Sequence, residues 1–286
     1  MGNKTISNVS DTALWMAAYR AQESERADAV FKDRLAKKLA GERGIRMVAG
    51  MPHSKAMAFA IVVRTVAIDE LVSSAIAKGV DTVINLGAGL DTRPYRMELP
   101  FHLRWIEVDL ELLISYKSEA LAAEEPVCRL QRISANLADE EGRGRLLRKL
   151  GEETGNALVI TEGVIGYLTN DQVARLSLDL FAVPAFHYWI LDYSQGKHRK
   201  NRHSDDVAHK LRDTAPWKFS MADPIGFFRS QGWKMTENTY ILDQADRLGR
   251  PLPLIFPWSL LMRLFPKKIR DMGNRTFGYA MLGKSH

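Results

Sequence analysis

The sequence has very little cysteine: Cys128 is the single cysteine among 286 residues. An intramolecular disulfide is therefore excluded. Because Cys128 lies in an apolar run, we expect a small buried side chain rather than a nucleophile. The first eight residues contain no apolar run of the kind found in secretory signals. We therefore expect a cytoplasmic protein.

Long apolar runs are also missing. The late segment from Leu252 to Phe265 is apolar, but it is too short to span a bilayer and is interrupted by Pro257 and Arg263. We expect it to pack in the core or to cover a substrate, and we expect no transmembrane segment. The whole chain is 46% hydrophobic and 26% charged, which is typical of a soluble globular protein.

The chain carries a formal net charge of +6, which raises the question of nucleic acid. Its basic clusters are not interleaved with aromatic residues, and no nucleic-acid-binding motif accompanies them; they lie at 143–149, 197–202 and 267–270. This pattern argues against nucleic acid as a partner and favours a solvated basic face. A patch that attracts an anionic substrate is the alternative.

Apolar periodicity predicts helices first, then alternating strands and helices. A first helix is predicted over 12–40 with Asp11 as its N-cap, and a second over 55–78, ending at Gly79. Short apolar strands are predicted at 82–86, 103–108, 127–133, 157–161 and 186–192, with helices between them at 110–123, 139–151 and 170–182. In the remaining residues, the same pattern predicts a helix near 223–231 and strands near 234–242 and 276–282. Such alternation predicts an α/β fold whose mostly parallel sheet is covered on both faces.

A glycine turn follows the first predicted strand, in the run Gly87-Ala88-Gly89-Leu-Asp-Thr92-Arg93. Glycines without a Cβ let the backbone approach a nucleotide-like ligand closely. The dinucleotide fingerprint requires a third small residue at the sixth position, where this chain has Thr92. The turn is therefore a poor match to a dinucleotide site.

Polar side chains occur at the ends of the following strands, where open parallel sheets bind ligands. Asp109 lies about twenty residues after the glycines and can accept both hydroxyls of a ribose; a helix N-cap is the alternative. Asn136 and Leu137 suit the edge and face of an adenine, although a simple turn explains them nearly as well. Glu162 ends the fourth strand and either meets an ammonium group or is a half-exposed structural residue.

These residues together resemble the leucine carboxyl methyltransferase family. The resemblance rests on the runs 64–69, 87–93, 107–109 with Lys117 downstream, and 162–167, and more loosely on 12–33. That family belongs to the class I methyltransferases, which depend on S-adenosyl-L-methionine (SAM), and includes bacterial polyketide O-methyltransferases. The resemblance covers roughly residues 10–195 and, less closely, the tail.

The resemblance implies a Rossmann-like seven-stranded sheet, mostly parallel with an antiparallel last strand, and an added helical cap. We expect one SAM-dependent methyltransferase domain over 1–286. Residues 1–54 would be an N-terminal helical extension within it, and about 195–275 would be cap or lid insertions.

The resemblance also implies roles for individual residues. Arg64 would pair with the carboxylate of the methionine moiety, as a fork-shaped guanidinium can, and Glu162 would lie near its ammonium group. Gly87, Ala88 and Gly89 would line the cofactor. The remaining cofactor-binding assignments are Asp109 for the ribose and Asn136 with Leu137 for the adenine. Arg20 is a weaker candidate for the cofactor carboxylate or the substrate, and Arg93 is either a ligand or a helix-surface or salt-bridging residue.

The expected activity is transfer of a methyl group from SAM to a hydroxyl or carboxylate oxygen of a small molecule, of which a polyketide-like secondary metabolite is one. Tyr167, Asp192 and Tyr193 are candidates for the acceptor pocket. No residue is assigned as catalytic and no metal is expected. A dinucleotide-dependent oxidoreductase shares the Gly-x-Gly and the distal Asp but lacks a recognisable reduction set. A SAM-binding protein without catalysis is the third alternative, and a tRNA methyltransferase lacks any visible RNA module.

Overall fold

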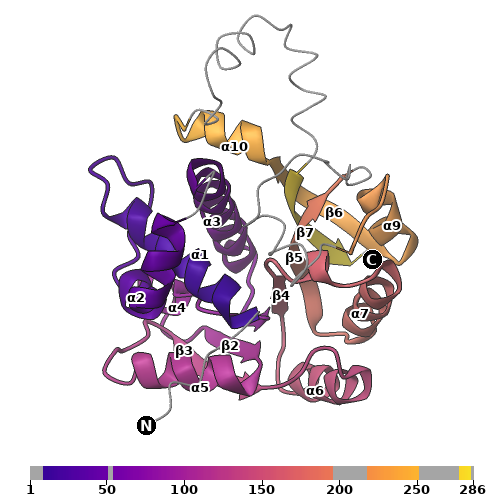
Figure 1. Ribbon diagram of the computed structural model, residues 1–286. Helices are drawn as coiled ribbons and strands as arrows, with labels where there is room; N and C mark the ends of the chain where they lie inside the picture. Colours follow the sequence, from indigo (N-terminus) through magenta and orange to yellow (C-terminus); the bar gives the residue numbers. More distant parts are fainter. Residues whose placement is uncertain (1–8, 51–53, 196–217, 251–276, 285–286) are drawn as a thin grey trace, which may run out of the picture.

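The computed structural model describes residues 9–50, 54–195, 218–250 and 277–284. A seven-stranded sheet with the order β3-β2-β1-β4-β5-β7-β6 runs through these residues (Figure 1). The strands are β1 (Thr82–Leu86), β2 (Arg104–Asp109), β3 (Arg129–Ser134), β4 (Ala157–Thr161), β5 (Phe186–Ser194), β6 (Trp233–Tyr240) and β7 (Phe277–Lys284). Neighbouring strands among β1 to β5 pair in parallel, whereas β7 is antiparallel to both β5 and β6. The expected sheet with its antiparallel last strand is confirmed.

Helices cover both faces of the sheet. One apolar cluster joins the sheet to α6 (Glu140–Glu152), α7 (Asn170–Ala182) and α9 (Pro224–Ser230). The other joins it to α3 (Ser54–Ala77) and α10 (Ile241–Arg247). Central strand β1 shows why: Ile84 belongs to the first cluster and Val83 to the second, because successive side chains point to opposite faces. Both sides of β1 are therefore buried, as in other doubly covered parallel sheets.

The predicted helix over 12–40 is wrong as a single element. It consists of α1 (Val9–Ser24) and α2 (Ala36–Ala49), separated by non-helical residues. Asp11 lies inside the first turn of α1 rather than at its N-cap. Just before the second helix, the carboxylate of Asp33 accepts hydrogen bonds from the backbone N–H groups of Leu35 and Ala36, at 3.3 and 3.0 Å. In Figure 1 α1 and α2 lie together beside α3.

Other predicted boundaries agree with the structure to within a few residues. Gly79 follows α3 with a φ of +89°, which suits the left-handed residue after a helix. The helix α7 is capped by Thr169, in a reciprocal capping box with Gln172. The helix α5 (Glu111–Ala120) follows β2 as predicted, whereas α4 (Arg93–Arg96), α10 and the 3₁₀ turn Ile165–Tyr167 were not predicted. None of the described helices is long and apolar enough to cross a membrane.

Candidate functional site

A cavity of about 320 Å³ lies at the carboxyl ends of β1 to β4. Its walls are formed by the segments that follow those strands, together with residues of α1 and α3. The volume falls within the range of small-molecule sites. Its place in the fold is also where open α/β sheets bind ligands. The cavity is lined by all eight residues that we assigned to the cofactor: Arg64, Gly87, Ala88, Gly89, Asp109, Asn136, Leu137 and Glu162.

The glycine turn after β1 leaves no room for side chains at its first position. Gly87 has a φ of +71°, and a Cβ there would lie 2.5 Å from a methyl carbon of Val164. Its backbone N–H and that of Ala88 both donate to the carbonyl of Val108, at 2.8 and 3.2 Å. Gly89 also has a positive φ, of +49°. The turn therefore brings the backbone itself to the cavity wall.

The carboxylate of Asp109 joins the glycine turn to the end of β2. One oxygen accepts the N–H of Gly89 at 2.6 Å and the other accepts the N–H of Leu110 at 2.7 Å. The N-cap of α5 is Leu110 and no side chain caps that helix, so the capping alternative for Asp109 is wrong. Burial raises the pKa of Asp109 above its ordinary value, and the two backbone hydrogen bonds offset only part of this effect.

The segment after β3 contributes Ala135, Asn136, Leu137 and Ala138 to the cavity wall. The side-chain oxygen of Asn136 accepts the N–H of Ala138 at 3.0 Å, which is the local bond of a polar turn. The oxygen of Asn136 therefore takes part in a turn, as one of the two interpretations predicts. Asn136 also lies on the cavity wall, so its assignment to the adenine stays a prediction.

Glu162 is held between two guanidinium groups. Its carboxylate oxygens lie 2.9 Å from Nε of Arg64 and 2.8 Å from Nη1 of Arg93. Burial alone would raise the pKa of Glu162, but Arg93 and Arg64 outweigh it and hold the pKa below its ordinary value. Arg93 is only 2% exposed. It is thus a salt-bridging residue, and the helix-surface alternative is wrong.

Three further charged residues complete this cluster, and the sequence did not single them out as site residues. Asp69 on α3 accepts from Nε of Arg93 at 2.6 Å and pairs with Arg96, also at 2.6 Å. Asp91 lies 3.1 Å from Nη1 of Arg93. Burial would raise the pKa of Asp91, but Arg93 above all keeps it well below its ordinary value. Asp91 and Glu162 therefore remain ionised at neutral pH.

The three residues proposed for the acceptor pocket are placed differently from one another. Tyr167 lines the cavity. Asp192 does not; it accepts the N–H of Gly163 at 2.8 Å and lies 3.6 Å from Nη1 of Arg64, behind the wall. Tyr193 packs in a core cluster and its hydroxyl donates to Asn238 at 2.9 Å. Of these three residues, only Tyr167 lines this cavity, and the assignment of the three to an acceptor pocket stays a prediction.

The first helix contributes Thr12, Ala13, Met16 and Arg20 to the cavity wall. Arg20 is already paired, because its Nε lies 2.9 Å from Asp33 and its Nη2 donates to the carbonyl of Leu90 at 2.6 Å. The hydroxyl of Thr92 donates to the same Asp33 oxygen as Arg20 Nε, at 2.6 Å. Thr92, which breaks the dinucleotide fingerprint, therefore ties the glycine turn to the N-terminal helices.

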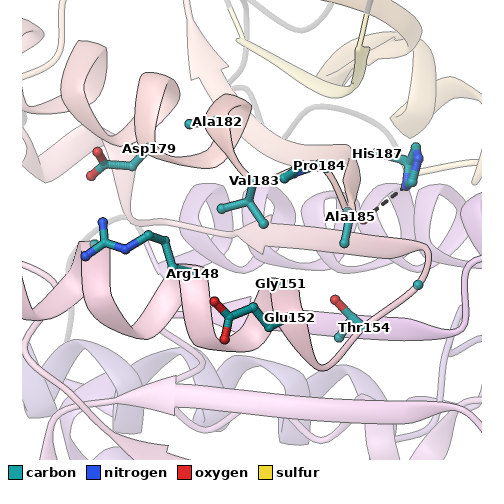
Figure 2. A pocket seen from close by; sticks show the side chains of 12 residues that line it. Arg148, Gly151, Glu152, Thr154, Asp179, Ala182, Val183, Pro184, Ala185 and His187 are labelled. Carbon is teal, nitrogen blue, oxygen red and sulfur yellow. Dashed lines mark hydrogen bonds between the residues drawn. The ribbon is translucent and has the colours of Figure 1, made fainter.

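A second hollow of about 720 Å³ lies between α6 and α7, near the amino ends of β4 and β5. Figure 2 shows Asp179 and Arg148 at one end of this groove and His187 at the other. His187 Nδ1 lies 3.0 Å from the carbonyl oxygen of Ala185, as the dashed line marks. Despite its larger volume, the groove lies at the end of the strands opposite to that at which such sheets bind ligands. We therefore place the candidate site in the first cavity.

The donor set of that cavity fits SAM. It combines a carboxylate beside a glycine turn, an arginine and a glutamate on one wall, and an amide beside the apolar side chains of Leu110, Leu113 and Leu137. A ribose, an amino-acid end and an adenine require groups of these kinds, respectively. The cavity thus has one suitable wall for each part of the cofactor.

Comparisons with known proteins identify relatives that are named for dependence on SAM. The family model described as leucine carboxyl methyltransferase matches residues 13–180. A protein of Streptomyces avermitilis, named as an inferred S-adenosyl-L-methionine-dependent methyltransferase, is 31% identical over 86% of this chain and 90% of its own length. A similarly named protein of Frankia alni is also 31% identical, over 88% of this chain and 91% of its own. A crystal structure of an inferred methyltransferase from Thermobifida fusca superposes with a TM-score of 0.57 over 99% of this chain and 97% of that one. At 15% identity, it shows the shared fold.

Proposed function

Because the chain belongs to the leucine carboxyl methyltransferase family, and is accordingly a SAM-dependent methyltransferase, we propose that it methylates an oxygen of a small molecule. The acceptor atom is a carboxylate oxygen or an acidic hydroxyl, and a polyketide-like metabolite is one class that offers both. The observation that carries the proposal is the convergence of Arg64, Asp109 and Glu162 on one cavity. The dinucleotide-dependent alternative is set aside, because the family match covers most of the sheet.

The proposed cofactor contacts follow the cavity walls. Asp109 accepts the ribose hydroxyls through the lone pairs that its two backbone contacts leave free. Asn136 and Leu137 hold the adenine, and Gly87 to Gly89 allow the backbone to approach the ribose and the methionine moiety. Arg64 holds the methionine carboxylate while Glu162 receives the ammonium group.

When bound, SAM supplies a methyl group on a sulfonium, which is already activated for transfer. The protein therefore contributes mainly alignment of the acceptor oxygen and exclusion of water. Among the described residues that line the cavity there is no histidine, lysine or cysteine. Its Asp91 and Glu162 carboxylates have lowered pKa values because arginines face them, and Asp109, whose pKa burial raises, is assigned to the ribose. Such groups are poor proton acceptors, which favours an acceptor oxygen that is ionised without their help.

The test is methyl transfer from methyl-labelled SAM into a small-molecule extract of the producing organism. We expect label in a small organic product when the wild-type protein is present, and much less with Asp109→Asn when SAM is supplied at a concentration near the wild-type Kd. Mild alkali then separates the two acceptor types, because a methyl ester releases labelled methanol and a methyl ether does not. Label that appears only in protein or RNA would overturn the small-molecule proposal.

We also propose that residues 1–286 form one methyltransferase domain, in which 1–54 is an N-terminal extension that contributes to the cofactor cavity through α1. The proposed lid over about 195–275 falls partly on residues 196–217 and 251–276, which lie outside the described residues together with the apolar segment from Leu252 to Phe265. The lid remains a prediction.

A further inference from the structure

The segment that follows β3 presents four consecutive residues, Ala135 to Ala138, to the cofactor cavity. Its two ends are held by backbone hydrogen bonds, from Ala135 N–H to the carbonyl of Asp109 at 2.9 Å and from Asp139 N–H to that of Asn136 at 3.0 Å. The carbonyl of Leu137, in the middle of the segment, is held by a side chain. Nη1 of Arg143 donates to it at 2.9 Å.

Arg143 reaches this carbonyl from the first turns of α6 and is only 4% exposed. Its Nε and Nη2 both donate to one oxygen of Asp179 on α7, at 3.0 and 2.7 Å. Asp179 lies on the wall of the second groove, where its side chain is 34% exposed (Figure 2). One buried guanidinium therefore connects helix α7 to the cofactor-facing segment.

The shape of the guanidinium is what makes this connection. Its planar fork sends donors in two directions at once, whereas the ammonium group of a lysine is a compact point charge on a flexible stem. A lysine at position 143 retains the charge that Asp179 requires. It cannot maintain the paired bonds to Asp179 and the bond to the Leu137 carbonyl together.

We propose that Arg143 is a positioning residue for the adenine side of the cofactor. It fixes the Leu137 carbonyl, and through it the cavity wall from Ala135 to Ala138, while Asp179 fixes the orientation of Arg143. The inference rests on the proposed assignment of Asn136 and Leu137 to the adenine. It adds two residues, Arg143 and Asp179, that do not themselves line the cavity.

The test measures binding of two ligands by calorimetric titration. S-adenosylhomocysteine carries both the adenosine and the amino-acid end, whereas 5′-methylthioadenosine carries the adenosine alone. We expect Arg143→Lys to raise Kd for both ligands by a similar factor, about tenfold, which is the loss of one hydrogen bond to a charged group. We expect Asp179→Asn to raise both in the same direction by a smaller factor. Arg64→Lys should raise Kd only for S-adenosylhomocysteine.

The chain offers a matched control in Arg175, which pairs with Glu140 at 2.5 Å and so also links α7 to α6. Its side chain is 62% exposed and does not contact the cofactor-facing segment. Arg175→Lys should therefore change neither affinity. The thermal midpoint of each variant is measured beside its affinities, so that a loss of affinity is separated from a loss of stability.

Three outcomes would overturn the proposal. In the first, Arg143→Lys lowers the thermal midpoint but leaves both affinities within twofold, which would make Arg143 a structural residue alone. In the second, it weakens S-adenosylhomocysteine but not 5′-methylthioadenosine, which would place its effect at the amino-acid end. If the wild-type protein binds neither ligand, the proposed cofactor site itself is wrong, and this inference is overturned with it.

Discussion

Replacing Asp109 by asparagine should weaken cofactor binding far more than it weakens the fold. Each oxygen of the ionised carboxylate accepts one backbone N–H and keeps a lone pair for a ribose hydroxyl. The amide of asparagine has one acceptor and carries no charge, so one ribose bond is lost and the other is weakened. A hydrogen bond to a charged group contributes about 1.5–3 kcal/mol, so we expect a loss of about 2 kcal/mol, or roughly 30-fold in Kd.

The free energy of unfolding of the Asp109→Asn variant should differ from that of the wild type by much less, about 1 kcal/mol or less. The pKa of Asp109 is raised by burial, so ionisation of this group costs stability in the folded protein at neutral pH. A neutral amide removes that cost while it loses backbone hydrogen bonds, and the two effects oppose each other. As pH falls through the raised folded pKa, protonation of Asp109 should make the free protein more stable while its affinity for the cofactor decreases.

Calorimetric titration with S-adenosylhomocysteine measures the first effect, and urea unfolding measures the second. A 2′-deoxy analogue of the ligand turns the assay into a double-mutant cycle, in which the losses from the residue and from the hydroxyl should not add. Glu111→Gln is the matched control, because this exposed carboxylate lies two residues farther along and does not line the cavity. Additive losses, or an Asp109→Asn variant that binds within twofold of wild type, would refute the ribose assignment.

Three further outcomes are expected. Glu162→Gln should lower the free energy of unfolding at neutral pH by about 1–3 kcal/mol, because two guanidinium groups lose an ionised partner. Since the folded pKa of Glu162 is depressed, this difference in stability should shrink as pH falls below 4.5 and through the folded pKa. Urea unfolding at several pH values measures the difference, and a difference that stays constant with pH would contradict the prediction. Gly87→Ala should lower the free energy of unfolding by more than about 2 kcal/mol, because the residue has a positive φ and its new Cβ would overlap Val164. The double variant Gly87→Ala/Val164→Ala should regain only the part of this loss that is due to the overlap. Full recovery of stability in thermal unfolding would exclude backbone strain. Burial raises the pKa of Cys128 to about 11, so its thiol should resist alkylation near pH 8 in the native protein and react in urea, and rapid native labelling would show that it is accessible.

The central strands of the sheet could be predicted from sequence because each strand is marked by the residues within it. The apolar residues of β1 and β4 are buried along their whole length, and each of these strands appears in the sequence as a short apolar run. The ends of these strands could be predicted too, and with them the position of Asp109 and Glu162. In an open parallel sheet these ends meet at one edge, so residues far apart in the chain could be assigned to one site before the fold was known.

The break between α1 and α2 could not be predicted from periodicity, because apolar residues continue at helical spacing through it. The deciding contacts of Asp33 include Arg20 on α1 and Thr92 beyond β1, and such distant partners leave no periodic signal. The capping tendency of an aspartate three residues before Ala36 was the local sign that was present.

The arginine cluster was also beyond sequence reasoning. Arg93 could be recognised as charged, but its burial and its shared contacts with Asp69 and Glu162 depend on how α3 and β4 pack. Tyr193 does not line the cavity, although its place in the sequence made it a pocket candidate. It lies near a strand end in the sequence, yet the alternation of β5 turns it into the apolar core.

We expect the N-terminal helices and the glycine turn to open together in local unfolding, because Asp33 joins them. Its buried carboxylate receives donors from α1, from the start of α2 and from Thr92, so releasing any one of these segments leaves the others with an unpaired partner. A ligand that orders the turn should then also slow amide hydrogen exchange in α1 and α2. Trimming the N-terminal extension should therefore also loosen the glycine turn, because it removes the partner of Thr92.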